Sequence, residues 1–415
     1  MGKHEAPKIG DQATAVERAM EALKVVERTD PLIKAWSFLD KDLVLKAAKK
    51  CDQIYRGGEL YGTVIAVKDI YDTVDMPTIY GSPIYEGYRP ARDANVVAQL
   101  RKTGAILLGK TTTTEFASSY PSPTRNPLAL AHTPGGSSSG SAAAVASGMV
   151  PVALGSQTLG SIIRPASYCG VVGFKPSYGR LSRTGVLSLS ETLDTLGFLG
   201  RSVSDVARVY RCLAGDRRIR DFDRAQPSIA FCKAPGWELT SDDARTAIAD
   251  YVRRLKEKGF AIGEIELPAE FEQLPHAGIT IHDFEVCRNF TWEKLCHYEK
   301  LSKNFKDILT RGEKVSVNEY EVAIEVGERC RAHFKRVMGS FDILITLSAT
   351  TEAPKGLTVT GSPAVNIAWT LLRGPCVSLP KLFGASQMPI GVQLIGVQFS
   401  DATVLGGAAW LERWG

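Results

Sequence analysis

Apolar residues recur at helical spacing in several stretches of the chain. Residues 13–28 (ATAVERAMEALKVVER) carry such a stripe, and Asp11 precedes it as a candidate cap. A second amphipathic stretch covers about residues 40–55. Asp93 stands where an N-cap is expected for a helix over residues 94–103. These patterns predict α-helices.

Short, almost uninterrupted apolar runs separate the helical stretches. Their length and content are typical of buried strands. They occur at residues 63–69, 105–108, 150–154, 227–232, 341–348 and 388–396. Helix and strand patterns that alternate in this way favour an α/β fold with a large, partly parallel central sheet. No repeat or low-complexity linker divides the chain, so we expect one domain over residues 1–415, with a charged helical layer at about residues 282–340.

Composition narrows the function classes. The 415 residues carry 50 Lys and Arg against 45 Asp and Glu, and a net charge of +5 on this length does not indicate nucleic-acid binding. The eight cysteines form no CxxC pair and the six histidines no HExxH motif, so we expect neither a metal site nor a disulfide framework. The first residues lack the apolar stretch of a signal peptide. We therefore expect a cytoplasmic protein with reduced thiols.

One nucleotide-binding pattern is rejected on context. Residues 104–111 (GAILLGKT) match the phosphate-loop pattern GxxxxGK[ST]. A phosphate loop follows a strand and opens a helix, whereas here a helix precedes Gly104 and the apolar residues 106–108 suit a buried strand. A nucleotide-hydrolysing enzyme remains only a distant alternative.

Residues 126–163 contain no Asp, Glu, Lys or Arg, a run of 38 uncharged positions. Its length invites a membrane-spanning interpretation, but a stretch rich in glycine, serine and proline does not suit a lipid-embedded helix, so we expect no membrane contact. The run ends in the turn GSQTLGS (155–161), which places Ser161 beside several backbone amides. A serine hydroxyl beneath free amides is what acyl transfer requires. Ordinary capping serines are the alternative.

A serine nucleophile needs a base. No Ser–His–Asp arrangement is evident, and His132, just before a Thr-Pro turn, is more typical of a structural position. Lys68 ends a predicted buried strand, and burial can lower the pKa of a lysine towards neutrality. The alternative for Lys68 is a salt bridge with Asp69 or another acid.

The chain carries a series of motifs in a fixed order. They are VKDIYDTVDMPTIYGS (67–82), GKTTTTEFA (109–117), TPGGSSSGSAAAVASG (133–148), the long segment 154–186 with GSQTLGSIIRPASYCGVVGFKPSYGR inside it, LDTLGFLGRSV (193–203), GPCVSLP and MPIGVQLIG. With these motifs the chain resembles the amidase signature hydrolases over most of its length. The resemblance implies a mixed, partly parallel central sheet covered by helices on both faces, and a signature core at about residues 61–205.

The resemblance also implies a Ser–cis-Ser–Lys triad. Its lysine corresponds to Lys68, its cis-serine to Ser137 and its nucleophile to Ser161. Neutral Lys68 would take a proton from Ser161 through Ser137, and the acyl-enzyme would then be hydrolysed. This chemistry implies neither a metal nor an organic cofactor.

The same resemblance assigns the oxyanion hole to the backbone amides of Thr158, Leu159, Gly160 and Ser161. Leu159 departs from the family, in which many members have glycine. If this position required a positive φ, leucine would cost about 1–2 kcal/mol. Its side chain could also narrow the substrate pocket.

The malonamidase-type branch suggests the substrate. In that branch, an arginine three residues after the nucleophile, here Arg164, binds a free carboxylate of the substrate, and Ser138 is assigned to substrate binding beside it. The expected function is hydrolysis of a small, carboxylate-bearing amide to an acid and ammonia or an amine. The alternative for Arg164 is a structural role on loop carbonyls.

Two other functions stay open. One is that of the glutamine-hydrolysing subunit of an amidotransferase, which shares the motifs but works in a complex. The other is a non-catalytic binding protein of the same fold, disabled at Leu159. The expected partner is a small-molecule amide, and the resemblance makes a homodimer plausible.

Overall fold

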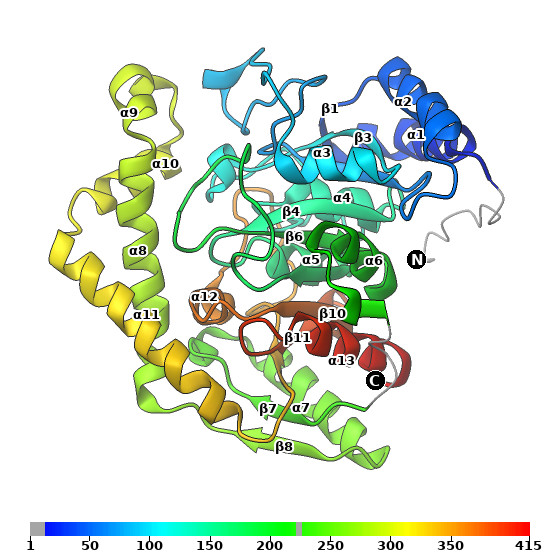
Figure 1. The fold of residues 1–415 in the computed structure, drawn as a ribbon. Coiled ribbons are helices and arrows are strands. Elements are labelled where there is room, and N and C mark those ends of the chain that lie inside the picture. The colour runs from blue at the N-terminus through cyan, green and yellow to red at the C-terminus, as the bar shows by residue number, and fades with distance from the viewer. Residues whose placement is uncertain (1–12, 221–225) are drawn as a thin grey trace.

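One sheet of eleven strands organises the computed structural model, which describes residues 13–220 and 226–415 (Figure 1). The strand order is β1-β3-β2-β4-β6-β5-β10-β11-β9-β7-β8. The strands are β1 (Trp36–Phe38), β2 (Val64–Lys68), β3 (Ile106–Thr111), β4 (Val152–Gln157), β5 (Val172–Lys175), β6 (Thr195–Gly200), β7 (Ile229–Cys232), β8 (Ile262–Ile265), β9 (Ile343–Leu347), β10 (Cys376–Phe383) and β11 (Pro389–Ile395).

The sheet is mixed, as predicted. β2 runs parallel to β3 and β4, and β7 runs parallel to β8 and β9. The central strands β4, β6, β5, β10 and β11 pair antiparallel in succession. Parallel strands need long crossover connections, and helices supply them at both ends of the sheet.

Helices cover both faces of the sheet. They are α1 (Ala15–Ile33), α2 (Lys41–Ile54), α3 (Asn95–Lys102), α4 (Ser139–Ala146), α5 (Ile163–Cys169), α6 (Val203–Ala214), α7 (Asp242–Glu257), α8 (Leu274–Asn289), α9 (Thr291–His297), α10 (Lys303–Gly312), α11 (Val317–Met338), α12 (Ala364–Leu371) and α13 (Asp401–Trp414). Strand β2 shows the division, because side chains alternate between the faces of a strand. Ile65 and Val67 belong to the core shared with α3, α6 and α13. Val64 and Ala66 belong to the core shared with α1, α2 and α4.

Two predicted helix caps differ from those observed. Helix α1 is capped by Thr14, whose side chain and Glu17 form a reciprocal capping box. The cap predicted from the sequence, Asp11, lies outside the described residues. Helix α3 begins after Ala94 without a side-chain cap. Asp93 instead accepts the amide of Val74 and forms a salt bridge with Arg101 of α3 at 3.0 Å, so its carboxylate joins a neighbouring loop to the helix without capping it.

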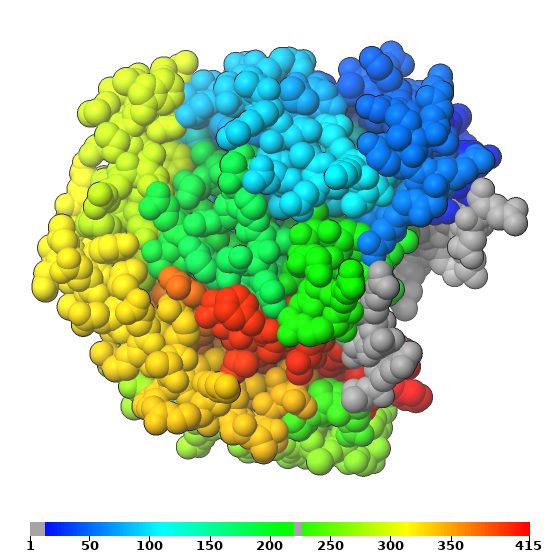
Figure 2. Space-filling model, viewed as in Figure 1, coloured from blue at the N-terminus to red at the C-terminus, as the bar shows by residue number. Residues whose placement is uncertain are grey.

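The helices α8 to α11 lie side by side along one flank of the molecule (Figure 1). This segment, light green to yellow, forms the left edge of the surface in Figure 2. It contains most of the residues for which the sequence predicts a helical layer. Within residues 13–220 and 226–415, no helix has the length and apolar content needed to cross a membrane.

Candidate active site

Two segments that are distant in sequence from Lys68, the last residue of β2, meet around its side chain. One is the glycine- and serine-rich loop before α4, in which the Gly136–Ser137 peptide is cis, as the resemblance implies. The other is the end of β4. Lys68 Nζ donates to Ser137 Oγ at 2.7 Å and to Ser156 Oγ at 2.7 Å, so the amine links both segments.

Lys68 is fully buried, and no carboxylate lies within 4 Å of its amine in the described part of the chain. Burial lowers its pKa to about 7, although the more distant Asp194 opposes the shift. The salt bridge considered as an alternative does not form, because Asp69 pairs instead with Lys110 at 2.9 Å. A lysine that is neutral near pH 7 can accept a proton.

The pairing of Lys110 also bears on the phosphate-loop pattern. Lys110 lies on β3, is fully buried, and donates to Thr78 as well as contacting Asp69. Its ammonium group is therefore enclosed by protein partners rather than presented to an anion.

Ser161 follows β4 in a short turn. The strand continues past its predicted end at residue 154 and runs to Gln157, because residues 152–157 pair fully with β6. The side chain of Gln157 then accepts the amides of Ile162 and Ile163 and so caps the start of α5. Its amide nitrogen donates to Thr370, which in turn donates to the carbonyl of Leu159. The turn is held from both sides.

The groups assigned to catalysis are free in this turn. Across the described residues, the amides of Leu159, Gly160 and Ser161 donate to no acceptor, and the Ser161 hydroxyl has no hydrogen-bond partner. Thr158 is fixed by its hydroxyl, which donates to Asp194 at 2.6 Å. The turn thus presents unpaired N–H groups beside a serine hydroxyl, which is the arrangement that stabilises an oxyanion.

The φ angle of Leu159 is not positive, so leucine at this position causes no left-handed backbone strain. The leucine side chain is partly buried and packs against an apolar cluster that includes Ile163 and Leu193. Leucine at this position therefore adds an apolar wall next to the turn.

Arg164 is nearly inaccessible, with 4% of its surface exposed. Its Nη2 donates at 2.7 Å to the carbonyl of Gly136, which belongs to the cis peptide. Its Nε and Nη1 have no partner among the described residues. A Cβ added to Gly160 would lie 3.2 Å from Nη1, so this nitrogen is close to the turn that carries Ser161. Arg164 fastens the loop of Ser137 to the helix that follows Ser161 and retains an unpaired edge.

Ser138 is completely buried, and its hydroxyl bridges the backbone of Ser156, with 3.3 Å to both the amide and the carbonyl. This contact joins the serine-rich loop to β4. The geometry places Ser138 as a support for Ser156.

Sequence reasoning missed two residues of this site. Ser156 is the second hydroxyl on Lys68, and Asp194 holds Thr158 together with the amides of Leu189 and Ser190. The available indication for Ser156 was a hydroxyl next to a predicted strand in the segment that leads to Ser161. Nothing in the spacing connects Asp194 to Thr158.

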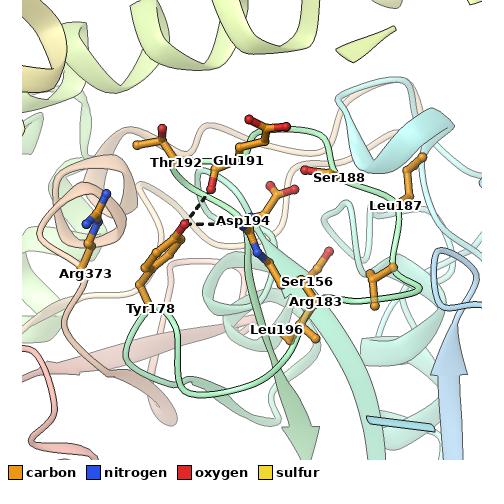
Figure 3. A pocket seen from close by; sticks show the side chains of 11 residues that line it. Ser156, Tyr178, Arg183, Leu187, Ser188, Glu191, Thr192, Asp194, Leu196 and Arg373 are labelled. Atoms are coloured by element: carbon orange, nitrogen blue, oxygen red, sulfur yellow. Dashed lines mark hydrogen bonds between the residues drawn. The ribbon is translucent and has the colours of Figure 1, made fainter. Parts of the chain in front are cut away.

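A pocket of about 440 Å³ opens beside Ser156 (Figure 3). A volume of this size suits a small molecule. Its lining combines apolar, hydroxyl and charged side chains. They are Ser156, Tyr178, Arg183, Val186, Leu187, Ser188, Glu191, Thr192, Asp194, Leu196 and Arg373.

Helix α8 supports the rim of this pocket. Glu285 on α8 accepts hydrogen bonds from the hydroxyls of Ser190 and Thr192 and from the Thr192 amide. It also accepts from Tyr320 on α11 at 2.9 Å. The helical layer therefore fixes the loop that lines the pocket.

Known proteins share this architecture. The profile of the amidase family matches residues 17–405. The A subunit of the glutamyl-tRNA(Gln) amidotransferase from Symbiobacterium thermophilum is 33% identical over 460 residues, covering 96% of this chain and 93% of the relative. Its counterpart from Staphylococcus epidermidis is 32% identical over 435 residues, covering 91% and 89%.

Solved structures agree with these relatives. A crystal structure of an amidase has a TM-score of 0.88 at 29% identity, with 97% of this chain and 96% of that chain covered. A chain from a vestigial protein complex, described as revealing the evolutionary origins of an s-triazine catabolic enzyme, has a TM-score of 0.90 at 27% identity and the same coverage. The chain belongs to the amidase signature family and is a hydrolase that acts on amide C–N bonds.

Proposed function

We propose that this chain hydrolyses a small, carboxylate-bearing amide through an acyl-enzyme on Ser161. The observation that carries the proposal is the buried amine of Lys68. It lies 2.7 Å from Ser137 Oγ, and burial lowers its pKa to about 7. Such an amine is a base without a competing counter-ion, and the family provides the reaction type.

In the proposed reaction, neutral Lys68 accepts a proton from Ser137 as Ser137 takes one from Ser161. The Ser161 oxygen attacks the amide carbonyl, and the negative charge that develops is met by backbone amides of the turn, those of Thr158, Leu159, Gly160 and Ser161. The protonated relay then delivers a proton to the leaving nitrogen, and ammonia or an amine departs. Water repeats the sequence on the acyl-enzyme and releases the acid.

The carboxylate preference rests on Arg164, as in the malonamidase-type enzymes. Its guanidinium uses one nitrogen on Gly136, while Nε and Nη1 are buried and unpaired among the described residues, with Nη1 close to Gly160. An unpaired guanidinium edge beside the nucleophile can receive a carboxylate adjacent to the scissile carbonyl. Leu159 would limit the size of the acyl group on the opposite side. Ser138 would then act by holding Ser156.

The test is ammonia release from matched pairs of amides, with the purified chain and its Ser161→Ala variant. Malonamate is paired with neutral malonamide, and glutamine is included. We expect turnover that depends on Ser161 and is strongest for the acidic member of a pair. Release by the Ser161→Ala variant at the rate of the parent would contradict the mechanism, and equal rates on both members of each pair would contradict the preference for acids.

A second function is favoured by the named relatives. Those at 32% and 33% identity are A subunits of glutamyl-tRNA(Gln) amidotransferases. Under this alternative the substrate is glutamine and the chain acts within an assembly. The same assay separates the two functions, since a protein that depends on partners would release little ammonia from free amides when purified alone.

Two further proposals have their own tests. Light scattering on the same sample tests the proposed homodimer, and limited proteolysis tests the proposed single domain.

A further inference from the structure

Two arginines flank one tyrosine in the pocket beside Ser156. The guanidinium of Arg373 lies 4.6 Å from the ring centre of Tyr178, and that of Arg183 lies 5.4 Å from it. Figure 3 shows the ring of Tyr178 between these two side chains. Arg183 also donates to the tyrosine hydroxyl at 3.2 Å. The ring therefore fixes two cations at one end of the pocket.

Neither cation forms a salt bridge with the protein. Within the described residues, no carboxylate oxygen lies within 4 Å of Arg183 or Arg373. The Nε of Arg373 is buried and has no hydrogen-bond partner there. Asp194 shares the pocket lining, but both its oxygens already accept hydrogen bonds, from Thr158 and from two backbone amides. Burial raises the pKa of Asp194, and the more distant charge of Arg183 partly opposes that rise.

A third guanidinium strengthens the positive field. Arg331 on α11 donates to the carbonyl of Leu371, two residues before Arg373, and its own Nε is buried without a partner among the described residues. Burial and the charge of Arg373 lower the pKa of Arg331 to about 10, and the charge of Glu328 partly opposes this shift. Neighbouring like charges repel, so an anion between them would stabilise this end of the pocket.

The rest of the lining is different in character. Val186, Leu187 and Leu196 supply apolar surface, and Ser156 supplies a hydroxyl that is bonded to Lys68. Glu191 and Asp194 supply carboxyl groups. A ligand that fits both ends has an aliphatic stem and a terminal anion. Its other end would lie next to the residues that carry the proposed chemistry.

We propose that this pocket is a carboxylate subsite, in which Arg183 and Arg373 bind a carboxylate separated from the scissile amide by an aliphatic stem. The inference rests on the proposed function for its substrate, a monoamide of an aliphatic dicarboxylic acid. Guanidinium groups bind carboxylates through paired hydrogen bonds, and both arginines have unused donors. Arg164 remains available for a carboxylate adjacent to the scissile carbonyl.

The test measures binding separately from turnover. Calorimetry on the full-length Ser161→Ala protein compares glutarate, a dianion, with neutral glutaramide. We expect glutarate to bind more tightly, and to bind more weakly as salt rises, because screening reduces the attraction between charges. Adding Arg373→Gln to the Ser161→Ala protein should lower its affinity for glutarate about 10- to 100-fold, which is the loss expected for charge-assisted hydrogen bonds. The affinity for glutaramide should stay unchanged.

The matched control is Arg254→Gln. Arg254 also stacks on a tyrosine, Tyr251, at 6.0 Å, but it lies exposed on α7 and away from the pocket lining. Arg373→Lys serves as a second variant that keeps the charge, and it should retain part of the affinity even if Arg373→Gln fails to fold. The subsite would be overturned if both Arg373 variants left glutarate binding unaffected. It would also be overturned if the Ser161→Ala protein did not bind glutarate.

The two proposals fail in different ways. Arg373-dependent glutarate binding with no ammonia release from any amide would retain the subsite and reject the proposed function. Ser161-dependent amide hydrolysis with Arg373-independent glutarate binding would do the reverse.

Discussion

Replacing Lys68 by methionine changes both catalysis and the pH dependence of stability. The pKa of Lys68 falls from 10.5 to about 7 on folding, chiefly because of burial. Between these values the unfolded chain binds more protons than the folded one, so the free energy of unfolding of the parent rises with pH. With about 1.36 kcal/mol for each pH unit, burial of Lys68 destabilises the parent by about 4–5 kcal/mol at pH 6 and about 2 kcal/mol at pH 9.

Methionine does not titrate, so the Lys68→Met variant lacks this dependence. It also leaves Ser137 and Ser156 without their donor, which costs a constant of about 1–3 kcal/mol for each buried hydroxyl left unpaired. The pH-dependent part is therefore the informative quantity. We expect the parent to gain about 2–3 kcal/mol of stability relative to Lys68→Met between pH 6 and pH 9.

Urea unfolding at several pH values measures this difference, with Lys49→Met on the exposed side of α2 as the control. In parallel, kcat/KM of the parent should fall as pH drops below about 7, because Lys68 then becomes protonated, and Lys68→Met should lose about 10²- to 10⁴-fold in rate. Parallel stability curves for the parent and Lys68→Met from pH 6 to 9 would refute the assignment of a neutral, buried lysine.

Two further substitutions test the surroundings of Lys68. Ser156→Ala removes one of the two hydrogen-bond acceptors of Lys68 and should lower kcat/KM about tenfold, the effect of losing one hydrogen bond. The control is Ser147→Ala, which removes a buried hydroxyl bonded to Ala143 on α4 and should leave kcat/KM unchanged. Lys110→Met leaves Asp69 buried and unpaired and should lower the free energy of unfolding by about 3–5 kcal/mol in urea titrations. Adding Asp69→Asn should recover part of that lost stability. If Lys110→Met alone were as stable as the parent, the ion pair of Lys110 with Asp69 would contribute nothing to stability.

The predictability of the fold follows the range of the interactions involved. The strands around residues 63–69, 227–232, 341–348 and 388–396 are marked by local apolar runs, and each is present within a few residues of its predicted bounds. The cap of α3 shows the limit of the local pattern, because the carboxylate of Asp93 is engaged by Val74 and Arg101 and no side chain caps the helix. At the end of β4, pairing with β6 extends the strand over residues that the local pattern assigns to a turn.

The site divides in a similar way. The ordered motifs that carry the family resemblance lead to Lys68, Ser137 and Ser161 as the proposed triad, because these motifs are readable along the chain. The contacts that give these residues their environment span much longer separations. Ser156 lies 88 residues from Lys68, and Asp194 lies 36 residues from Thr158. No local pattern encodes such pairs.

The α/β class, most of the helices and strands, and the family can all be read from the amino-acid sequence. The protonation and pairing of the charged groups depend on contacts that exist only in the folded chain. Asp69 could have paired with Lys68, its neighbour, but the parallel pairing of β2 with β3 brings Lys110 to it and leaves Lys68 without an acid within 4 Å among the residues described. The same folding places Arg373 beside Tyr178, 195 positions away in sequence. A charge depends on which groups surround it in space, and burial and pairing are set only when the sheet assembles.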